Sequence, residues 1–226
     1  MLDELMRAPK PFWEKFYEDR NQDVPFLQST YPDENLVDYF KHSISPETVL
    51  ELGCGPGRNA MYMARQGCEV EAVDLSENAI NWARQRAKKE NLSIRYRCGD
   101  VFKLNLLPDS YDFIYDSGLL HHLPPHQRID YLEIIAESLK SNGYFGLVCF
   151  TPDGGADISD WEVYRQFNMQ GGIGYQEDRL KEILEKKFTL SSFRKMKKME
   201  TSECLFGEDY LWTSLMKVKP SLDDFV

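Results

Sequence analysis

Three glycines and one acidic residue lie close together in the stretch VLELGCGPGRNA, residues 49–60. Gly53, Gly55 and Gly57 follow an apolar run that is typical of a buried strand, and Glu51 stands two residues before the first glycine. Without side chains in the way, a ligand can approach the backbone amides and the N-terminus of a following helix. A carboxylate beside such a loop repels a diphosphate and attracts an ammonium or sulfonium group. The stretch therefore predicts a site for a nucleoside-bearing ligand that carries positive charge.

A nicotinamide or flavin dinucleotide is the competing ligand for a loop of this kind. Its fingerprint is G-x-G-x-x-G, whereas this chain has the spacing G-x-G-x-G and carries Arg58 where the third glycine would stand. Pro56 also removes an amide hydrogen that a pyrophosphate can use. Both departures favour a cationic ligand over a dinucleotide.

Acidic residues recur at the ends of the next predicted strands. Asp74 ends the run 69–74, Asp100 follows the run 94–98, and Asp116 ends the run 111–116 with Ser117 behind it. The carboxyl ends of parallel strands meet at one edge of a sheet, where open α/β folds bind ligands. Each acid taken alone fits a helix cap or a turn equally well. Their succession in order is what indicates a ligand site.

The elements that must position these residues alternate between strands and helices. Strand-like runs at 49–52, 69–74, 94–98, 111–116 and 144–150 are separated by helical patterns, including 76–90 with Ser76 as its cap and about 127–140. This alternation is typical of a parallel sheet covered on both faces. After it come a long Gly- and Asp-rich stretch at 151–174, a helix at 175–188, and two β-like runs at 190–199 and 209–218. We expect the last two runs to close the sheet as an antiparallel pair.

The run E-L-G-C-G-P-G and the ordered acids after it resemble the motifs of class I S-adenosylmethionine (SAM) methyltransferases. The resemblance implies their α/β fold, a Rossmann-like, doubly wound, mainly parallel seven-stranded sheet with an antiparallel edge strand. It implies SAM as cofactor, with Asp74 on the ribose hydroxyls and Asp100 on the adenine amino group. The cofactor-binding residues that the resemblance implies are Tyr17, Arg20, Glu51, Gly53, Cys54, Gly55, Asp74, Leu75, Gly99, Asp100, Val101, Asp116 and Ser117.

The N-terminal segment resembles a narrower branch, the small-molecule methyltransferases of the thiopurine and tellurite-resistance type. The resemblance rests on G-R-N after the loop, on VPF and PDENLV, and on an aromatic stripe, Phe12, Trp13, Phe16 and Tyr17. In that branch the segment folds over the cofactor, where Tyr17 and Arg20 are possible counterparts of its aromatic and basic residues. Packing in the core and covering a ligand both remain open for the stripe.

Methyl transfer from a sulfonium needs alignment more than acid or base chemistry, and a base matters only when the acceptor must lose a proton. His121 and His122 follow the run 111–116, and we expect His121 to be the catalytic residue. The alternative is that one ring packs beside the cofactor and the other caps the loop. With His126 they do not predict a metal site, because neighbouring side chains diverge and two prolines interrupt the segment.

The acceptor is expected between the N-terminal segment and the stretch 151–174. Trp161, Tyr164 and Phe167 either wall this pocket or anchor the stretch to the core. The acidic residues of the stretch suit a cationic or neutral acceptor, and they are Asp153, Asp157, Asp160 and Glu162.

The net charge of −10 argues against nucleic acid as a partner, because Lys and Arg contacts with phosphate supply most non-specific affinity. One basic cluster, RKMKK at 194–198, fits either an RNA contact or a solvated strand face. The resemblance adds that no N-P-P-Y or D-P-P-Y tetrad follows the run 111–116, which counts against amino groups of nucleic acids and glutamine side chains. We expect a small-molecule acceptor. The alternatives are an RNA or protein methyltransferase and a non-catalytic SAM-binding module.

The length of 226 residues fits one domain. We expect a single methyltransferase domain over 1–226, with a helical segment over the cofactor at 1–45, a SAM-binding core at 46–150, and the substrate loop and closing elements at 151–226. No apolar run approaches the ~20 residues of a membrane span, no secretory signal opens the chain, and the five cysteines form no CxxC pair. These features predict a cytoplasmic protein with no membrane partner. The oligomeric state stays open.

Overall fold

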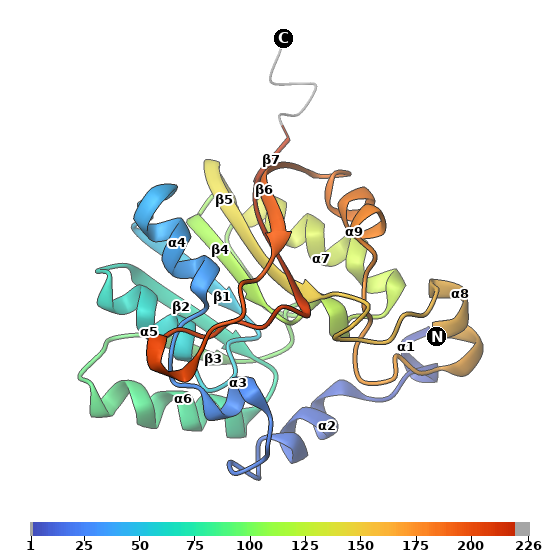
Figure 1. Ribbon diagram of the computed structural model, residues 1–226, viewed down its shortest axis with the longest axis horizontal. Helices are drawn as coiled ribbons and strands as arrows, with labels where there is room; N and C mark the ends of the chain where they lie inside the picture. Colours follow the sequence, from blue (N-terminus) through green and yellow to red (C-terminus); the bar gives the residue numbers. More distant parts are fainter. Residues whose placement is uncertain (1, 220–226) are drawn as a thin grey trace.

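A mixed seven-stranded sheet forms the centre of the computed structural model, which describes residues 2–219 (Figure 1). The strand order is β3-β2-β1-β4-β5-β7-β6. The strands are β1 Thr48–Leu52, β2 Glu69–Asp74, β3 Arg95–Cys98, β4 Tyr111–Ser117, β5 Leu139–Phe150, β6 Phe188–Lys195 and β7 Leu211–Val218. Strands β1 to β5 pair in parallel, while β7 runs antiparallel to both β5 and β6. The predicted doubly wound sheet with an antiparallel edge is confirmed.

Helices cover both faces of the sheet, as the alternation of elements predicts (Figure 1). They are α1 Leu2–Leu5, α2 Pro9–Phe16, α3 Pro25–Gln28, α4 Glu34–His42, α5 Arg58–Arg65, α6 Glu77–Lys89, α7 Pro125–Ser138, α8 Asp160–Gln166 and α9 Glu177–Leu184, with 3-10 turns at Leu120–His122 and Thr201–Glu203. Ser76 caps α6 by accepting a hydrogen bond from the amide of Ala79, as expected. Residues 2–42 contain four short helices, which agrees with the helical segment expected there.

Two hydrophobic cores lie on opposite faces of the sheet, because successive residues of a strand point to opposite sides. In β1, Val49 belongs to the core under α4, α5 and α6, whereas Leu50 belongs to the core under α7 and α9. Glu51 follows on the α5 side as a buried carboxylate in an otherwise apolar strand. The strand thus delivers one ionisable group directly to the carboxyl edge of the sheet.

The boundaries of α7 and β5 differ from the prediction. Helix α7 ends at Ser138, and β5 begins at once with Leu139 paired to Tyr111, so the Asn142-Gly143 pair lies inside an irregular strand. Ile129 of this helix is 64% exposed. Pro125 starts the helix two residues earlier than expected and suits the first turn, where its missing N–H costs nothing.

Candidate active site

A cavity of about 280 Å³ lies at the carboxyl edge of the parallel strands. Its lining includes the ends of β1, β2, β3 and β4, the N-terminal helices α1 and α2, and the C-terminal residues 206–211. Backbone hydrogen bonds join the strand ends, since Cys54 N donates to Val73 O and Gly99 N donates to Asp74 O, both at 2.9 Å. Residues that are distant in sequence therefore form one continuous wall. The expected site residues that line it are Tyr17, Glu51, Gly53, Cys54, Gly55, Asp74, Leu75, Gly99, Asp100, Val101, Ser117 and His121.

The glycine loop needs glycine for two separate reasons. Gly55 has a φ of +50°, and a Cβ there would come within 3.0 Å of the Tyr17 hydroxyl. Gly57 has a φ of +79°, and a Cβ there would lie 2.7 Å from the Tyr96 hydroxyl. The first contact brings the N-terminal segment against the loop, and the second brings α5 against the sheet. Both close approaches would be lost with any larger residue.

Asp74 joins the glycine loop to the start of α6. Its two carboxylate oxygens accept hydrogen bonds from the amides of Gly55 and Ser76, each at 2.9 Å. Burial raises the pKa of Asp74 to about 6, although these hydrogen bonds favour the charged form. Asp74 therefore has two roles. Its carboxylate holds the glycine loop and the start of α6 in place, as a turn or cap residue does, and it also lines the cavity.

Glu51 presents an unpaired carboxylate oxygen in a buried position. The residue is 2% exposed, and its Oε2 atom has no hydrogen-bond partner among the described residues. Burial raises the pKa of Glu51 to about 8, against the opposing effect of the nearby Arg58 guanidinium. A buried acceptor without a partner is unfavourable, so this oxygen suits a cationic group of a ligand.

Asp116 occupies a different place from the one expected. It is fully buried and does not line the cavity. Its carboxylate accepts hydrogen bonds from Leu119 N at 2.6 Å, Leu120 N at 3.0 Å and the Tyr131 hydroxyl at 2.8 Å. Asp116 therefore caps the turn after β4, and the expectation that it contacts the cofactor is corrected.

Replacing Asp116 with alanine is expected to destabilise the protein by about 2–4 kcal/mol, because three donors lose a buried acceptor. Thermal and denaturant unfolding measure this loss. The affinity of the folded variant for S-adenosylhomocysteine should stay within about threefold of the wild-type value. A large loss of affinity with unchanged stability would restore Asp116 to the cofactor site.

Arg20 also lies outside the cavity. Its guanidinium donates to Gln85 Oε1 at 3.0 Å and stacks 5.2 Å from the Trp82 ring, on the exposed side of α6. Tyr17 lines the cavity, whereas Arg20, three residues later, does not. The expected role of Arg20 as a cofactor ligand is corrected by this placement.

His121 lines the cavity, but the ring is held by its surroundings. It stacks on Phe150 with centroids 3.8 Å apart, and its Nδ1 atom accepts from the Phe150 amide at 3.3 Å. Burial lowers the pKa of His121 well below its usual value and that of His122 to about 4. Both rings are neutral at pH 7, and the Nδ1 lone pair of His121 is already engaged. The packing alternative for His121 fits this arrangement better than proton abstraction.

The remaining wall of the cavity is mostly aromatic and apolar. The strap formed by α1 and α2 contributes Met6 and Trp13, and the ring of Trp13 packs edge-on against His122 at 4.8 Å. The aromatic stripe of α2 thus covers a cavity with Trp13 and Tyr17, while Phe12 and Phe16 are partly buried against their neighbours. Other side chains of this wall are Phe26, Val148, Phe150, Met169, Phe206, Tyr210 and Leu211.

The stretch 151–174 reaches the cavity through a residue that the sequence does not single out. Met169 lines the cavity, whereas Trp161 is 73% exposed, Phe167 is 47% exposed, and Tyr164 contacts His126. The acidic side chains of the stretch do not line the cavity either. The expected aromatic walls and acidic lid are therefore corrected, and no preference for a cationic acceptor follows from them.

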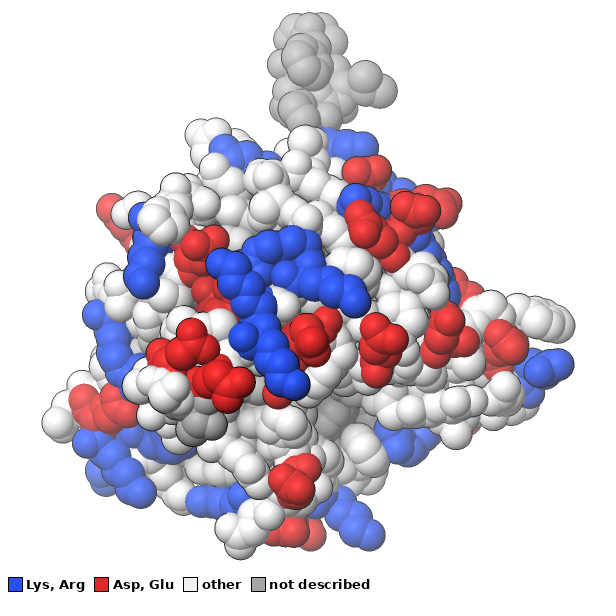
Figure 2. All heavy atoms as spheres, in the orientation of Figure 1, with Lys and Arg blue, Asp and Glu red and all other residues white. Residues whose placement is uncertain are grey.

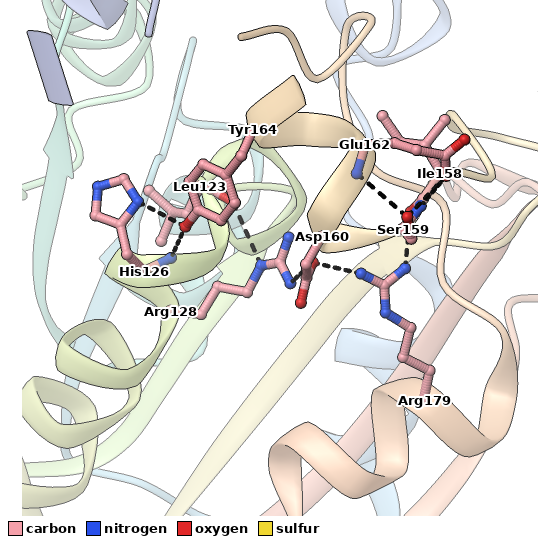
Figure 3. A network of polar contacts seen from close by, with 9 residues as sticks. All are labelled: Leu123, His126, Arg128, Ile158, Ser159, Asp160, Glu162, Tyr164 and Arg179. Carbon is pink, nitrogen blue, oxygen red and sulfur yellow. Dashed lines mark hydrogen bonds and ion pairs between the residues drawn. The ribbon is translucent and has the colours of Figure 1, made fainter. Parts of the chain in front are cut away.

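A network of charged and polar side chains holds this stretch against α7 and α9 (Figure 3). Asp160 accepts from the almost fully buried Arg128 at 2.8 Å and also pairs with Arg179. The Tyr164 hydroxyl accepts from the backbone amide of His126 at 2.9 Å, and Ser159 caps α8. The network thereby fixes the position of the segment whose Met169 side chain lines the cavity.

Replacing Asp160 with asparagine is expected to loosen the stretch 151–174. The variant leaves the buried Arg128 guanidinium without its carboxylate, at a cost of about 1–3 kcal/mol. Hydrogen exchange followed by mass spectrometry should show faster exchange in 151–174 than in the wild type. Exposed Asp157, replaced in the same way, serves as the control and should leave exchange unchanged.

The basic cluster is engaged with acidic neighbours. Figure 2 shows basic side chains gathered near the middle of one face, with acidic side chains around them. Arg194 pairs with both carboxylate oxygens of Glu34, and Lys195 lies 3.6 Å from Asp153. Met196 is buried beneath the cluster. This arrangement corresponds to a solvated strand face rather than a free phosphate-binding patch.

The search for metal ligands and membrane spans gave no candidate within residues 2–219. No group of three His, Cys, Asp or Glu side chains there is arranged to hold a metal ion. No helix in the same range is long and apolar enough to cross a membrane. Of the cysteines, Cys54, Cys68 and Cys149 are buried, Cys98 is partly buried and Cys204 is exposed.

Several cavity residues carry no recognisable signal in the sequence. Phe206 and Tyr210 lie in the connection before β7, and Phe206 reaches the cavity because its backbone pairs with residues 32–34. Arg58 follows the glycine loop directly, at the position where a dinucleotide fingerprint has its third glycine. Its place beside the last glycine is the one signal that marked it as close to a ligand.

Comparison with known proteins agrees with this geometry. A family model described as a methyltransferase domain matches residues 49–143. An uncharacterized methyltransferase of Schizosaccharomyces pombe is 26% identical over 54% of this chain and 85% of its own length. The probable SAM-dependent methyltransferase TehB of Haemophilus influenzae is 34% identical over 45% of this chain and 35% of its own length.

Solved structures show the same fold. The structure of Haemophilus influenzae TehB is 26% identical, covers 82% of this chain and 62% of its own, and gives a TM-score of 0.62. Burkholderia thailandensis 1,6-didemethyltoxoflavin-N1-methyltransferase, solved with S-adenosylhomocysteine, is 21% identical, covers 95% of this chain and 92% of its own, and gives 0.71. The chain has the fold of class I SAM-dependent methyltransferases, carries a methyltransferase-domain match over residues 49–143, and resembles the TehB-type enzymes.

Proposed function

We propose that the enzyme transfers a methyl group from SAM to a small-molecule acceptor held in the aromatic half of the cavity. The observation that carries this proposal is the enclosure of that half by the N-terminal strap. Asp3 accepts from Gln127 at 2.7 Å, and Glu14 accepts from the amide of Glu77 at 2.8 Å, so the strap is held at both ends. A cavity covered on this side by the strap favours a small acceptor over a protruding side chain or an RNA.

The division of labour follows the chain. Among the described residues, 46–150 supply the cofactor half and part of the acceptor wall, while 2–45 and 151–219 supply the strap and the rest of that wall. We also assign the enzyme to the cytoplasm, since its cysteines form no motif for pairing.

The residues of the site work mainly by alignment. SAM supplies a methyl group on a sulfonium, and its transfer leaves a neutral thioether. Glu51, Asp74 and the glycine loop orient the donor, and the aromatic side chains exclude water and place the acceptor behind the methyl group. Because His121 and His122 are neutral and buried, an acceptor with its own available lone pair suits this site best.

One structural neighbour supports a small acceptor. The Burkholderia enzyme is named for methylation of 1,6-didemethyltoxoflavin, a small molecule, and its structure holds that molecule together with S-adenosylhomocysteine. The RNA and protein alternatives depend on the basic cluster, in which Arg194 already pairs with Glu34 and Lys195 with Asp153.

An acceptor screen tests the proposal. Purified enzyme and SAM are incubated with neutral, cationic and anionic small molecules, and separately with bulk tRNA and with protein, while formation of S-adenosylhomocysteine is measured. Turnover with small molecules is the expected result. Turnover confined to tRNA or protein would overturn it, and so would tight cofactor binding without turnover on any acceptor, which indicates a binding module.

A further inference from the structure

The N-terminal strap crosses the cavity from the glycine loop to the start of α7. At the end of α2, the Tyr17 hydroxyl lies against the glycine loop. Further back in the chain, Trp13 packs against His122 with ring centroids 4.8 Å apart. At the other end of the strap, Asp3 accepts a hydrogen bond from Gln127 at 2.7 Å. The part of the strap between Asp3 and Trp13 therefore covers the half of the cavity that lies away from the glycine loop.

Arg7 is a cation in this part of the strap, and it lines the cavity. Its Cζ atom lies 3.5 Å from the ring centroid of Phe12, a half-buried side chain of α2. Within residues 2–219, Arg7 forms no hydrogen bond and no ion pair. The contact with the ring restricts the position of the guanidinium but uses none of its N–H donors. These donors therefore remain available to a ligand.

Arg58, the second arginine of the cavity lining, differs from Arg7 in this respect. Its Nη1 atom lies 2.5 Å from Asp33 Oδ1 and donates to the carbonyl of Tyr31 at 3.1 Å. A carboxylate of the protein thus compensates the charge of Arg58. Arg7 has no such partner among the described residues.

The acidic residues of the lining are engaged elsewhere or lie at the other half of the cavity. On the strap, Asp3 Oδ1 is held by Gln127 and by the His126 ring, whose Nε2 atom lies 2.8 Å away. The other acids of the lining stand at or just after the carboxyl ends of β1, β2 and β3, and they are Glu51, Asp74 and Asp100. None of these carboxylates forms an ion pair with Arg7.

The charge of Arg7 acts inside the cavity. Burial is the main cause that lowers the pKa of His122 to about 4, and the positive charge of Arg7 acts in the same direction. His122 lines the cavity and contacts Trp13. The field of Arg7 therefore reaches the wall against which we place the acceptor, where it favours a negatively charged group.

The uncharged side chains around this half are apolar. The strap adds Met6, Pro9 and Trp13 to the lining, and the stretch 151–174 adds Met169. Such a wall suits an apolar body, and one unpaired guanidinium suits one carboxylate, which it can bind through two parallel hydrogen bonds.

We infer that the methyl acceptor is an organic acid, with an apolar body enclosed under the strap and a carboxylate that Arg7 binds. The inference deepens the small-molecule function proposed above and rests on it. Arg7 determines specificity for the charge of the acceptor, and Phe12 positions its guanidinium. The acidic residues of 151–174, which suited a cationic or neutral acceptor, do not line the cavity and so do not oppose it.

Two matched compounds and three variants test the inference. Isothermal titration of enzyme saturated with S-adenosylhomocysteine measures the affinities of 2-naphthoate and 2-naphthamide, which share one ring system and differ in charge. The wild type should bind the carboxylate about 5- to 10-fold more tightly, as one charge-assisted contact near the surface provides. This preference should decrease as the salt concentration rises.

The variants assign the preference to one side chain. Arg7→Met should abolish it and leave the affinity for the amide within about twofold of the wild-type value. Arg7→Lys should retain part of it, because an ammonium keeps the charge but not the planar fork. Lys10→Met removes a strap cation that does not line the cavity, so it should leave both affinities unchanged.

The outcomes distinguish this inference from the function on which it rests. Wild-type enzyme that binds the amide as tightly as the carboxylate, or binds neither, would overturn the inference, and so would a preference that survives in Arg7→Met. Weakening of both compounds by Arg7→Met would show that Arg7 only holds the strap, and Arg7→Lys would then have to retain the preference for the inference to stand. Turnover of neutral small molecules alone would exclude an acidic acceptor but keep the small-molecule function, whereas turnover confined to tRNA or protein would remove that function itself.

Discussion

Asp74→Ala should weaken binding of S-adenosylhomocysteine by about 1–3 kcal/mol and lower the stability of the protein by a similar amount. The carboxylate both lines the cavity and accepts from the amides of Gly55 and Ser76. Removing the carboxylate leaves two backbone amides without an acceptor and breaks the link between the glycine loop and the start of α6. Isothermal titration and denaturant unfolding measure the two effects.

Two further variants make this prediction specific. Asp74→Asn keeps one acceptor oxygen and should fall between wild type and Asp74→Ala in both measurements. Asp112 also accepts from backbone amides, those of Glu47 and Thr48, but it lies near the start of β4, at the opposite edge of the sheet. Asp112→Ala should therefore reduce stability without changing cofactor affinity. Equal affinities for Asp74→Ala and wild type would exclude a contact between Asp74 and the ligand.

Glu51→Gln should stabilise the protein at alkaline pH while weakening the cofactor. Burial raises the pKa of Glu51 from 4.5 to about 8. The folded state therefore binds a proton that the unfolded state has released, so the stability is fully present below pH 4.5 and is lost as pH rises to about 8. One pKa unit corresponds to about 1.4 kcal/mol, which makes the total loss at most on the order of 5 kcal/mol. Glutamine cannot ionise and should flatten this slope, as melting temperatures between pH 5 and 9 would show.

The same substitution removes the partner of a cationic ligand group. Loss of a charge-assisted contact should weaken S-adenosylhomocysteine by about 1.5–3 kcal/mol. At pH 7 the wild-type carboxyl is protonated and must release its proton to bind an ammonium, so calorimetry in buffers of different ionisation enthalpy should detect proton release. Glu51→Gln should release none at this site.

Glu71 provides the contrasting control. It is buried on β2 but pairs with Arg95 at 3.2 Å and with Arg97 at 2.6 Å. Glu71→Gln should destabilise the protein, because it removes the partner of two cations, and should leave cofactor affinity unchanged. If Glu51→Gln also destabilises the protein at every pH, the oxygen of Glu51 is paired in solution and the argument from its burial is wrong.

The cofactor half of the site was predictable because its determinants are local. Gly53, Gly55 and Glu51 follow one buried strand, and Asp74 and Asp100 each follow another. Parallel strands bring such ends to one edge whatever the details of packing. Residue type and position along the chain were therefore sufficient to place these residues at the cavity.

Asp116 and Arg20 were expected at the cofactor half of the cavity but do not line it, and the reason is the same for both residues. Asp116 ends its strand just as Asp74 does, yet its carboxylate turns inward to Leu119, Leu120 and Tyr131. Arg20 follows Tyr17 closely, yet the chain has already turned toward α6. A side chain's direction depends on the backbone of the next few residues and on which donors surround it, and a motif contains neither.

The sequence by itself determined the alternation of elements, the glycine loop, and therefore the class of fold and the cofactor. Tertiary structure alone decided the acceptor wall, which joins Trp13, Met169 and Phe206 from three distant segments, and the pairing of Arg58 with Asp33 beside Glu51. The physical reason is the range of the interactions. Hydrogen-bonded strand ends are specified by neighbours in the chain, whereas a cavity wall is specified by packing between segments whose approach no local pattern records.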